Sequence, residues 1–228
     1  RDGAVELVPN SLGDCLTPSA ISIDAAGHVL VGLAARERLA TAPNDTAVGF
    51  KRWMGSDHKL RLRGRDYRPE ELSALVLRAL KQDAEAHAGQ RFDSAVITVP
   101  AYFNQAQRRA TQTAAELAGL TAARLLNEPT AAGLAYGLQE RPEHSTFLVF
   151  DLGGGTFDVS VLDYFEGVVQ VRASAGDTRL GGEDFGHALQ RLLVSKCQPQ
   201  QRAAAEAMAR SGALWQAAEQ AKRDLSDQ

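Results

Sequence analysis

One stretch of this 228-residue sequence, from Phe147 to Asp158, restricts the fold more than any other. The apolar run Phe147–Phe150 predicts a strand that ends in a carboxylate, Asp151. Three glycines follow, and glycine lets a backbone turn sharply and approach a ligand without interference from a Cβ atom. A second strand pattern begins at Asp158, so the chain is expected to reverse through this turn into an antiparallel neighbour.

The same turn is a candidate ligand site. Consecutive N–H groups in a glycine-rich turn form a nest that suits phosphate, and Thr156 adds a hydroxyl donor. Asp151 is placed to hold a metal ion directly or through water. The sequence contains neither G-x-x-x-x-G-K-[ST] nor G-x-G-x-x-G, so a nucleotide would bind through a hairpin and not through a helix-capping loop. A plain β-hairpin with a glycine-rich turn is the alternative.

The rest of the chain predicts a mixed α/β fold. An N-terminal β region, a β–α–β–α stretch, three antiparallel strands and helices follow in that order, with a boundary near residues 140–146. The expected strands are Val5–Val8, Ala20–Ile23, His28–Val31, Ala95–Val99, Arg124–Leu126, Phe147–Phe150, Asp158–Leu162 and Val168–Ala173. The expected helices are residues 69–89, 104–119 with an Asn104/Gln107 capping box, 129–137, one that starts beyond Asp184, and 199–228.

Composition excludes several classes of protein. The 25 Lys and Arg residues against 28 Asp and Glu give a net charge of −3, which argues against a nucleic-acid binder. The sequence has no apolar run of about 18 residues, so no transmembrane helix is expected. Two cysteines, Cys15 and Cys197, show no C-x-x-C pattern and favour a reducing compartment.

Three further groups are candidate site residues. Lys51 lies in the apolar stretch Val48–Met54, where a cation can face phosphate, although spacing alone favours a solvated surface lysine with an apolar stem. Glu128 lies between a strand and a helix, where it can orient water or metal, or stabilise the helix N-terminus. Glu219, Lys222, Arg223 and Ser226 share one helix face, which can contact a nucleoside or simply remain solvated.

Four motifs together resemble the seventy-kilodalton heat-shock chaperones, the DnaK-like family. They are Val96–Phe103, Asn127–Ala132, Asp151–Asp158 and Gly181–Phe185, and they occur in the order and at the spacing of that family. The resemblance covers essentially the whole chain. The stretches 2–19 and 50–57 look most like a specialised bacterial branch of the family.

The resemblance implies an actin-like ATPase fold with two lobes, each built on a ribonuclease-H-like core. Residues 1–145 would form the first lobe, with 18–69 as its outer subdomain. Residues 146–228 would begin the second lobe, with 183–228 in its outer subdomain. A first phosphate loop would precede Arg1 and further parts of the second lobe would follow Gln228, so the domain is incomplete at both ends.

The resemblance also assigns roles, with ATP or ADP and Mg²⁺ as cofactors. Lys51 and Glu128 match catalytic residues of the family, and Asp151 matches a residue that handles Mg²⁺ through water. Pro100 and Arg108 match a switch that relays the nucleotide state. The expected nucleotide-binding residues are Gly153, Gly154, Gly155, Thr156, Asp158, Gly181, Gly182, Glu219, Lys222, Arg223 and Ser226.

The implied function is that of part of a cytoplasmic chaperone that binds and releases unfolded peptides as it hydrolyses ATP. The implied partners of the parent protein are peptide clients, a J-domain co-chaperone and a nucleotide-exchange factor, with no nucleic acid and no membrane. The 228-residue chain by itself is expected to bind ATP weakly and to hydrolyse little. Two alternatives are a sugar kinase-like phosphotransferase on the same fold and a catalytically inactive nucleotide-binding or interaction module.

Overall fold

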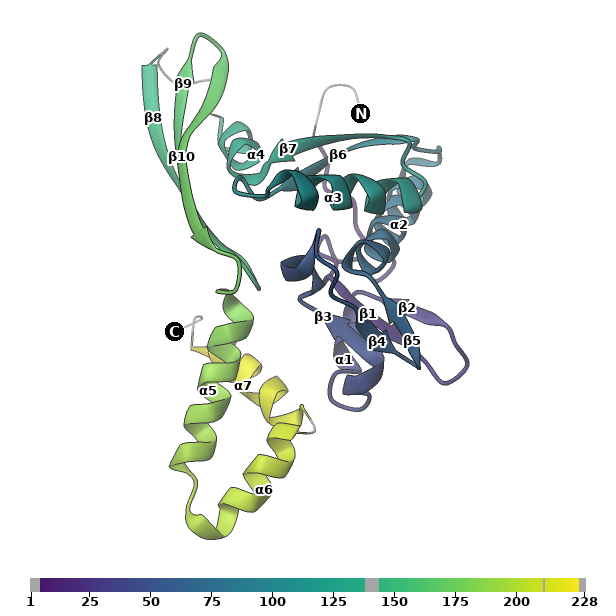
Figure 1. Ribbon diagram of the computed structural model, residues 1–228, viewed down its shortest axis with the longest axis vertical. Coiled ribbons are helices and arrows are strands. Elements are labelled where there is room, and N and C mark those ends of the chain that lie inside the picture. Colours follow the sequence, from purple (N-terminus) through teal and green to yellow (C-terminus); the bar gives the residue numbers. More distant parts are fainter. Residues whose placement is uncertain (1–4, 138–143, 211, 226–228) are drawn as a thin grey trace.

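The computed structural model describes residues 5–137, 144–210 and 212–225, and Figure 1 shows the arrangement of its elements. The first sheet has β1 (Ala20–Ile23) at its centre, with β2 (Val29–Val31) and β3 (Thr46–Val48) antiparallel on either side. Around it lie α1 (Leu33–Glu37), the 3-10 helices η1 (Pro43–Asp45) and η2 (Phe50–Trp53), and the hairpin of β4 (Leu60–Leu62) and β5 (Arg65–Tyr67). The predicted β1–β2 hairpin is therefore confirmed.

Helix α2 (Pro69–Ala88) covers this first sheet. It begins at Pro69, whose missing N–H costs nothing at a helix start, and ends at Gly89 in the left-handed conformation with φ +68°. Leu72 and Val76 pack into one apolar core with Ile21 and its neighbours. The helical spacing of apolar residues predicted this element at the observed position.

Strands β6 (Ser94–Val99) and β7 (Ala122–Asn127) form a parallel pair. Parallel strands need a crossover, which α3 (Gln105–Leu117) supplies after a capping box in which Asn104 and Gln107 exchange two hydrogen bonds of 3.0 Å. Helix α4 (Glu128–Ala135) follows β7 without a loop. Because parallel strands end at the same edge, Pro100 and Glu128 are brought to one side of the sheet.

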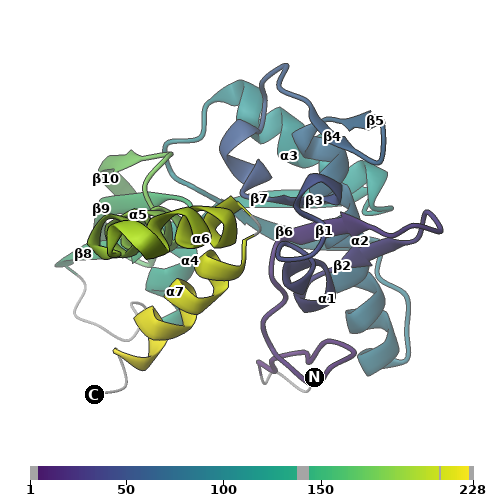
Figure 2. The ribbon, with the colours of Figure 1, turned by 90° about the horizontal axis from the view of Figure 1, so that it is seen from below.

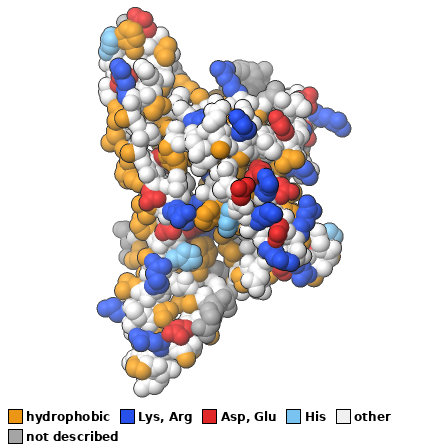
Figure 3. Space-filling view, viewed as in Figure 1, with side chains coloured by type: hydrophobic (Ala, Val, Ile, Leu, Met, Phe, Trp, Pro, Cys, Tyr) orange, Lys and Arg blue, Asp and Glu red, His pale blue; other side chains and the backbone are white. Residues whose placement is uncertain are grey.

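Three strands form an antiparallel meander: β8 (His144–Leu152), β9 (Phe157–Phe165) and β10 (Val168–Asp177). They are longer than predicted but pair as expected. One face of β8 remains uncovered, since Leu148 and Phe150 are 67% and 65% exposed. Figure 3 shows the resulting line of apolar side chains along the arm that this meander forms.

Helices α5 (Gly182–Lys196), α6 (Pro199–Arg210) and α7 (Ala213–Asp224) follow the meander. Figures 1 and 2 agree that α5–α7 and β8–β10 lie on one side of the molecule and that β1–β5 with α1 and α2 lie on the other. Among the described helices, none has both the length and the apolar character needed to cross a membrane.

The predicted strand Val5–Val8 is wrong. Val5 is 99% and Leu7 74% exposed, and neither lies in a strand. An apolar alternation becomes a strand only where a neighbouring backbone completes the hydrogen-bond ladder. The described part of the β6–β7 sheet contains only those two strands and does not reach this segment, which contacts α2 through a hydrogen bond of 3.0 Å between Glu6 and His87.

Candidate functional site

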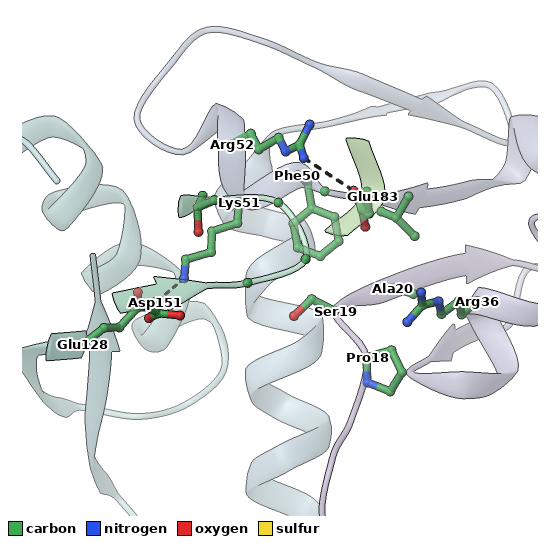
Figure 4. Close-up of a pocket in the computed structure, with 16 residues that line it drawn as sticks. Pro18, Ser19, Ala20, Arg36, Phe50, Lys51, Arg52, Glu128, Asp151 and Glu183 are labelled. Carbon is green, nitrogen blue, oxygen red and sulfur yellow. Dashed lines mark hydrogen bonds and ion pairs between the residues drawn. The ribbon is translucent and has the colours of Figure 1, made fainter. Parts of the chain in front are cut away.

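A pocket of about 360 Å³ opens between the two sides of the molecule (Figure 4). This volume falls at the lower end of the range typical of small-molecule sites. Its lining comes from Pro18, Ser19, Ala20, Arg36, Val48, Gly49, Phe50, Lys51, Arg52, Glu128, Asp151, Gly153, Gly154, Gly155, Thr156 and Glu183. The structure therefore brings Lys51, Glu128, Asp151 and the glycine-rich turn together from three distant stretches of sequence.

Lys51 and Glu128 form an ion pair across the pocket, with 2.6 Å between Nζ and Oε1. The 3-10 helix η2 presents Lys51, and Phe50 anchors that helix because its side chain is buried in the first core. Glu128 is the first residue of α4 and its side chain points toward Lys51 (Figure 4). The Lys51 side chain is 45% exposed and that of Glu128 only 18%, and both residues line the pocket.

The glycine-rich turn is held from behind by the start of α5. The N–H groups of Gly182 and Glu183 donate to the carbonyl oxygens of Gly153 and Gly154 at 2.9 and 2.8 Å. In a trans peptide the N–H points opposite to the C=O, so the N–H groups of Gly154 and Gly155 are directed away from α5. Within the described residues neither of these two N–H groups has an acceptor, and such a pair of donors suits an anion.

Gly181 is required by this close backbone approach. A Cβ atom on Gly181 would lie 2.5 Å from the carbonyl carbon and 2.6 Å from the oxygen of Gly154. By contrast, a Cβ atom on Gly154 would meet nothing within 4 Å. Backbone packing therefore requires glycine at position 181. No contact within the described protein requires glycine at position 154.

Two carboxylates face each other on the strands that flank the turn. Asp151 on β8 lies opposite Asp158 on β9, and only Asp151 lines the pocket. Asp158 is 3% exposed, and its Oδ1 has no hydrogen-bond partner among the described residues. Burial, reinforced by the negative charges of Glu128 and Asp151, raises the pKa of Asp158 to about 6.

The donor set of the pocket fits a nucleotide with Mg²⁺. Within the described chain, the Asp151 carboxylate makes no hydrogen bond or ion pair, and carboxylate oxygens are the ligands that Mg²⁺ prefers. The two N–H donors of the turn and the Lys51 ammonium provide the groups that phosphate oxygens accept from. The pocket thus combines a cation, a carboxylate and backbone N–H donors, which are the types of group that bind metal ions and phosphate.

Arg52 closes one end of the pocket, and the sequence alone did not identify it. Its guanidinium donates two hydrogen bonds to Asp184, at 2.6 and 3.3 Å, and lies 4.0 Å from Glu183. Burial opposes ionisation of Asp184, but these bonds and the Arg52 charge outweigh it and lower the pKa of Asp184. Burial raises the pKa of Glu183. No local signal could reveal a pair that is separated by 132 residues.

The charged face of α7 lies beside the pocket, and its residues contact the pocket wall. Glu219 pairs with Lys222 at 2.6 Å, and lies 3.9 Å from Arg36 and 3.8 Å from Arg223. Lys222 also donates to the carbonyl oxygen of Gly182 at 2.9 Å. Ser226, which was expected to share this face, lies outside the described residues.

Arg108 ties the loop after β6, which begins at Pro100, to the residue before Glu128. Arg108 donates to the side chain of Asn127 at 2.8 Å and to the carbonyl oxygens of Ala101 and Phe103 at 3.2 and 2.9 Å. Pro100 is fully buried. The residue before Glu128 is thereby tied to the loop that follows β6.

Comparison with known proteins identifies the family of this chain. The model of the Hsp70 protein family matches residues 1–61 and 56–228, which together span the chain. The chaperone protein DnaK of Thermotoga petrophila and that of Thermotoga maritima are each 46% identical over 229 residues. The alignment covers 99% of this chain but 38% of each relative, so the chain spans less than half of their length. The chain belongs to the Hsp70 protein family.

Proposed function

We propose that the pocket binds ATP and ADP with Mg²⁺ and that it contributes one part of an ATP-hydrolysing site. The observation that carries this proposal is the convergence of Lys51, Glu128, Asp151 and the turn at Gly153–Thr156 on one cavity. Membership of the family, whose named relatives here are DnaK chaperones, supports the same assignment. It also implies an actin-like α/β fold.

Each residue of the pocket has a proposed role. The N–H groups of Gly154 and Gly155 bind phosphate oxygens, and the Lys51 ammonium stabilises negative charge on the transferred phosphoryl group. Glu128 orients the attacking water, and its ion pair with Lys51 fixes where both groups lie. Asp151 would hold Mg²⁺ through water, and the metal, when bound, neutralises phosphate charge. Asp158 supports this site from the strand behind it.

The adenosine part of the ligand would lie toward α7. Glu219, Lys222 and Arg223 would form that side, with Gly181 and Gly182 as the backbone between it and the phosphate turn. Ser226 completes the same proposed group, and its placement is not described. Pro100 and Arg108 would relay the occupancy of the site through Asn127.

In the proposed domain division, residues 1–145 form a first lobe, with 18–69 as its outer subdomain. Residues 146–228 begin a second lobe, with 183–228 in its outer subdomain, and each lobe has a ribonuclease-H-like core. The separation into two sides in Figures 1 and 2 supports this division. Because the chain spans 38% of its relatives, peptide clients, a J-domain co-chaperone, a nucleotide-exchange factor and a cytoplasmic location are proposed for the parent protein only.

Single-turnover hydrolysis of Mg·ATP by the longest natural protein that contains this chain tests the proposal. Lys51→Ala should lower the hydrolysis rate by about 10²–10³ and change ATP affinity much less, since the cation acts mainly on the transition state. Lys59→Ala is the matched control, because Lys59 is an exposed lysine that does not line this pocket. Equal rates for Lys51→Ala and the wild type would refute the assignment. The 228-residue chain by itself should hydrolyse ATP slowly.

A further inference from the structure

Trp53 connects the two sides of the molecule through a contact that the proposed chemistry does not use. It is the last residue of η2, two positions after Lys51. The guanidinium carbon of Arg179 lies 5.0 Å from the centroid of its ring, within the range of a cation–π interaction. The ring of His58 stacks on Trp53 with 4.3 Å between centroids, so the indole is held in place by a residue from its own side of the molecule.

The position and contacts of Arg179 leave its guanidinium available for the Trp53 ring. It lies in the short segment between β10 and α5, where its backbone N–H donates a hydrogen bond of 2.7 Å to the side chain of Asp177. Among the described residues, the Arg179 guanidinium forms no ion pair with a carboxylate, and it lies against the Trp53 ring. The guanidinium of Arg179 therefore holds the β10–α5 segment against η2 and is not engaged by a carboxylate.

The segment that carries Arg179 also supports the glycine-rich turn. Two residues later, Gly181 packs directly against Gly154, and the N–H groups at the start of α5 hold the turn's carbonyl oxygens. Trp53 and Arg179 thus join the element that bears Lys51 to the element that orients the turn's N–H donors. The Arg52–Asp184 ion pair joins the same two elements a short distance away.

The second tryptophan forms a similar contact in the opposite direction. Trp215 of α7 has the guanidinium carbon of Arg36, from α1, 5.6 Å from its ring centroid. The sequence contains two tryptophans, and each one faces an arginine from the other side of the molecule. A contact between an arginine and a tryptophan therefore joins the two sides of the molecule at two places.

We propose that Trp53 and Arg179 are positioning residues, which set the distance between the Lys51 ammonium and the phosphate-binding turn. This inference rests on the proposed function of the pocket. Neither residue touches the reacting atoms in this assignment, and both act through the backbone segments that they join. Their removal should loosen the placement of Lys51, and misplacement of a catalytic group slows the chemical step more than it weakens binding.

The test compares Trp53→Leu and Arg179→Gln with wild type in the natural protein, measuring the single-turnover rate at saturating Mg·ATP and the ATP affinity separately. Each variant should reduce the rate by about 2- to 30-fold, the range equivalent to one cation–π contact. ATP affinity should change less. The double variant should be no slower than the slower single variant, and Trp53→Phe, which keeps an aromatic face, should recover part of the rate.

Arg65→Gln is the matched control. Arg65 lies 4.8 Å over the ring of Tyr67 within one hairpin, so its replacement removes the same kind of contact without spanning the pocket. Its rate should equal that of the wild type. A second readout needs no nucleotide: in the 228-residue chain with Trp215→Phe, acrylamide should quench Trp53 more strongly once Arg179→Gln is added.

The outcomes separate this inference from the function on which it rests. Hydrolysis by the wild type with unchanged rates in both variants would overturn the positioning role and leave the proposed function intact. Rate losses that add in the double variant, or unchanged acrylamide quenching, would also overturn it. If the wild type hydrolyses no ATP, the proposed function fails, and the positioning role fails with it.

Discussion

Replacement of Gly154 by valine should weaken ADP binding without unfolding the protein. The reason is that a Cβ atom on Gly154 meets no protein atom within 4 Å, and the residue lines the pocket. Its backbone does not adopt the left-handed conformation that strains other residues. The added side chain would therefore occupy space beside the proposed phosphate position and would not disturb the packing of the turn.

The size of the effect follows from the hydrogen bonds at stake. The carbonyl oxygens of Gly153 and Gly154 are held by α5, so the turn cannot move aside to restore contact with the ligand. A hydrogen bond to a charged group contributes about 1.5–3 kcal/mol. Loss of one such bond to phosphate should raise the Kd for ADP by about 10- to 150-fold. Gly154→Ala should give a smaller increase.

Calorimetric titration with ADP, together with a thermal melt of each variant, provides the assay. Gly181→Ala is the contrasting variant, because its Cβ atom would lie 2.5 Å from the carbonyl carbon of Gly154 and must displace backbone. It should lower the Tm as well as the affinity. Normal ADP affinity in Gly154→Val, with a normal melt, would refute the view that this turn binds phosphate.

Three further predictions concern stability. Because burial raises the pKa of Asp158 from 3.8 to about 6 on folding, the metal-free protein should lose about 2 kcal/mol of stability as the pH rises from 4 to 7. Urea unfolding across that range should detect the loss, and Asp158→Asn should abolish this component. Asn104→Ala removes the α3 cap and should cost about 1 kcal/mol in the same assay, whereas Asn104→Ser should retain most of it. Arg108→Ala removes two hydrogen bonds to the β6–α3 loop and one to Asn127, and should cost about 2 kcal/mol or more. An unchanged unfolding midpoint would contradict this role of Arg108.

The elements that sequence predicts well are those with local signals. Proline and glycine mark the ends of α2, the capping box marks α3, and the glycine-rich turn between two apolar runs marks β8 and β9. In each case the residues that determine the element lie within it or next to it. The grouping of Lys51, Glu128 and Asp151 came from the family resemblance, since nothing in their spacing requires them to meet.

The elements that sequence predicts poorly depend on distant partners. Val5–Val8 has the pattern of a strand, but its state depends on a neighbouring strand and not on its own residues. The contacts of Arg52 with Asp184 and of Trp53 with Arg179 join residues more than a hundred positions apart. The close packing of Gly181 on the turn is likewise invisible until both segments are placed.

The different surroundings of Gly181 and Gly154 have an evolutionary consequence. Selection for folding acts on Gly181 in every descendant of this protein, whether or not it retains activity, because any side chain there collides with backbone. Selection on Gly154 acts only through a ligand, since the described protein leaves room for larger residues. In a lineage that no longer binds nucleotide, substitutions should therefore accumulate at position 154 while position 181 stays glycine. The number of substitutions at position 154 relative to position 181 would then indicate how long ago nucleotide binding was lost.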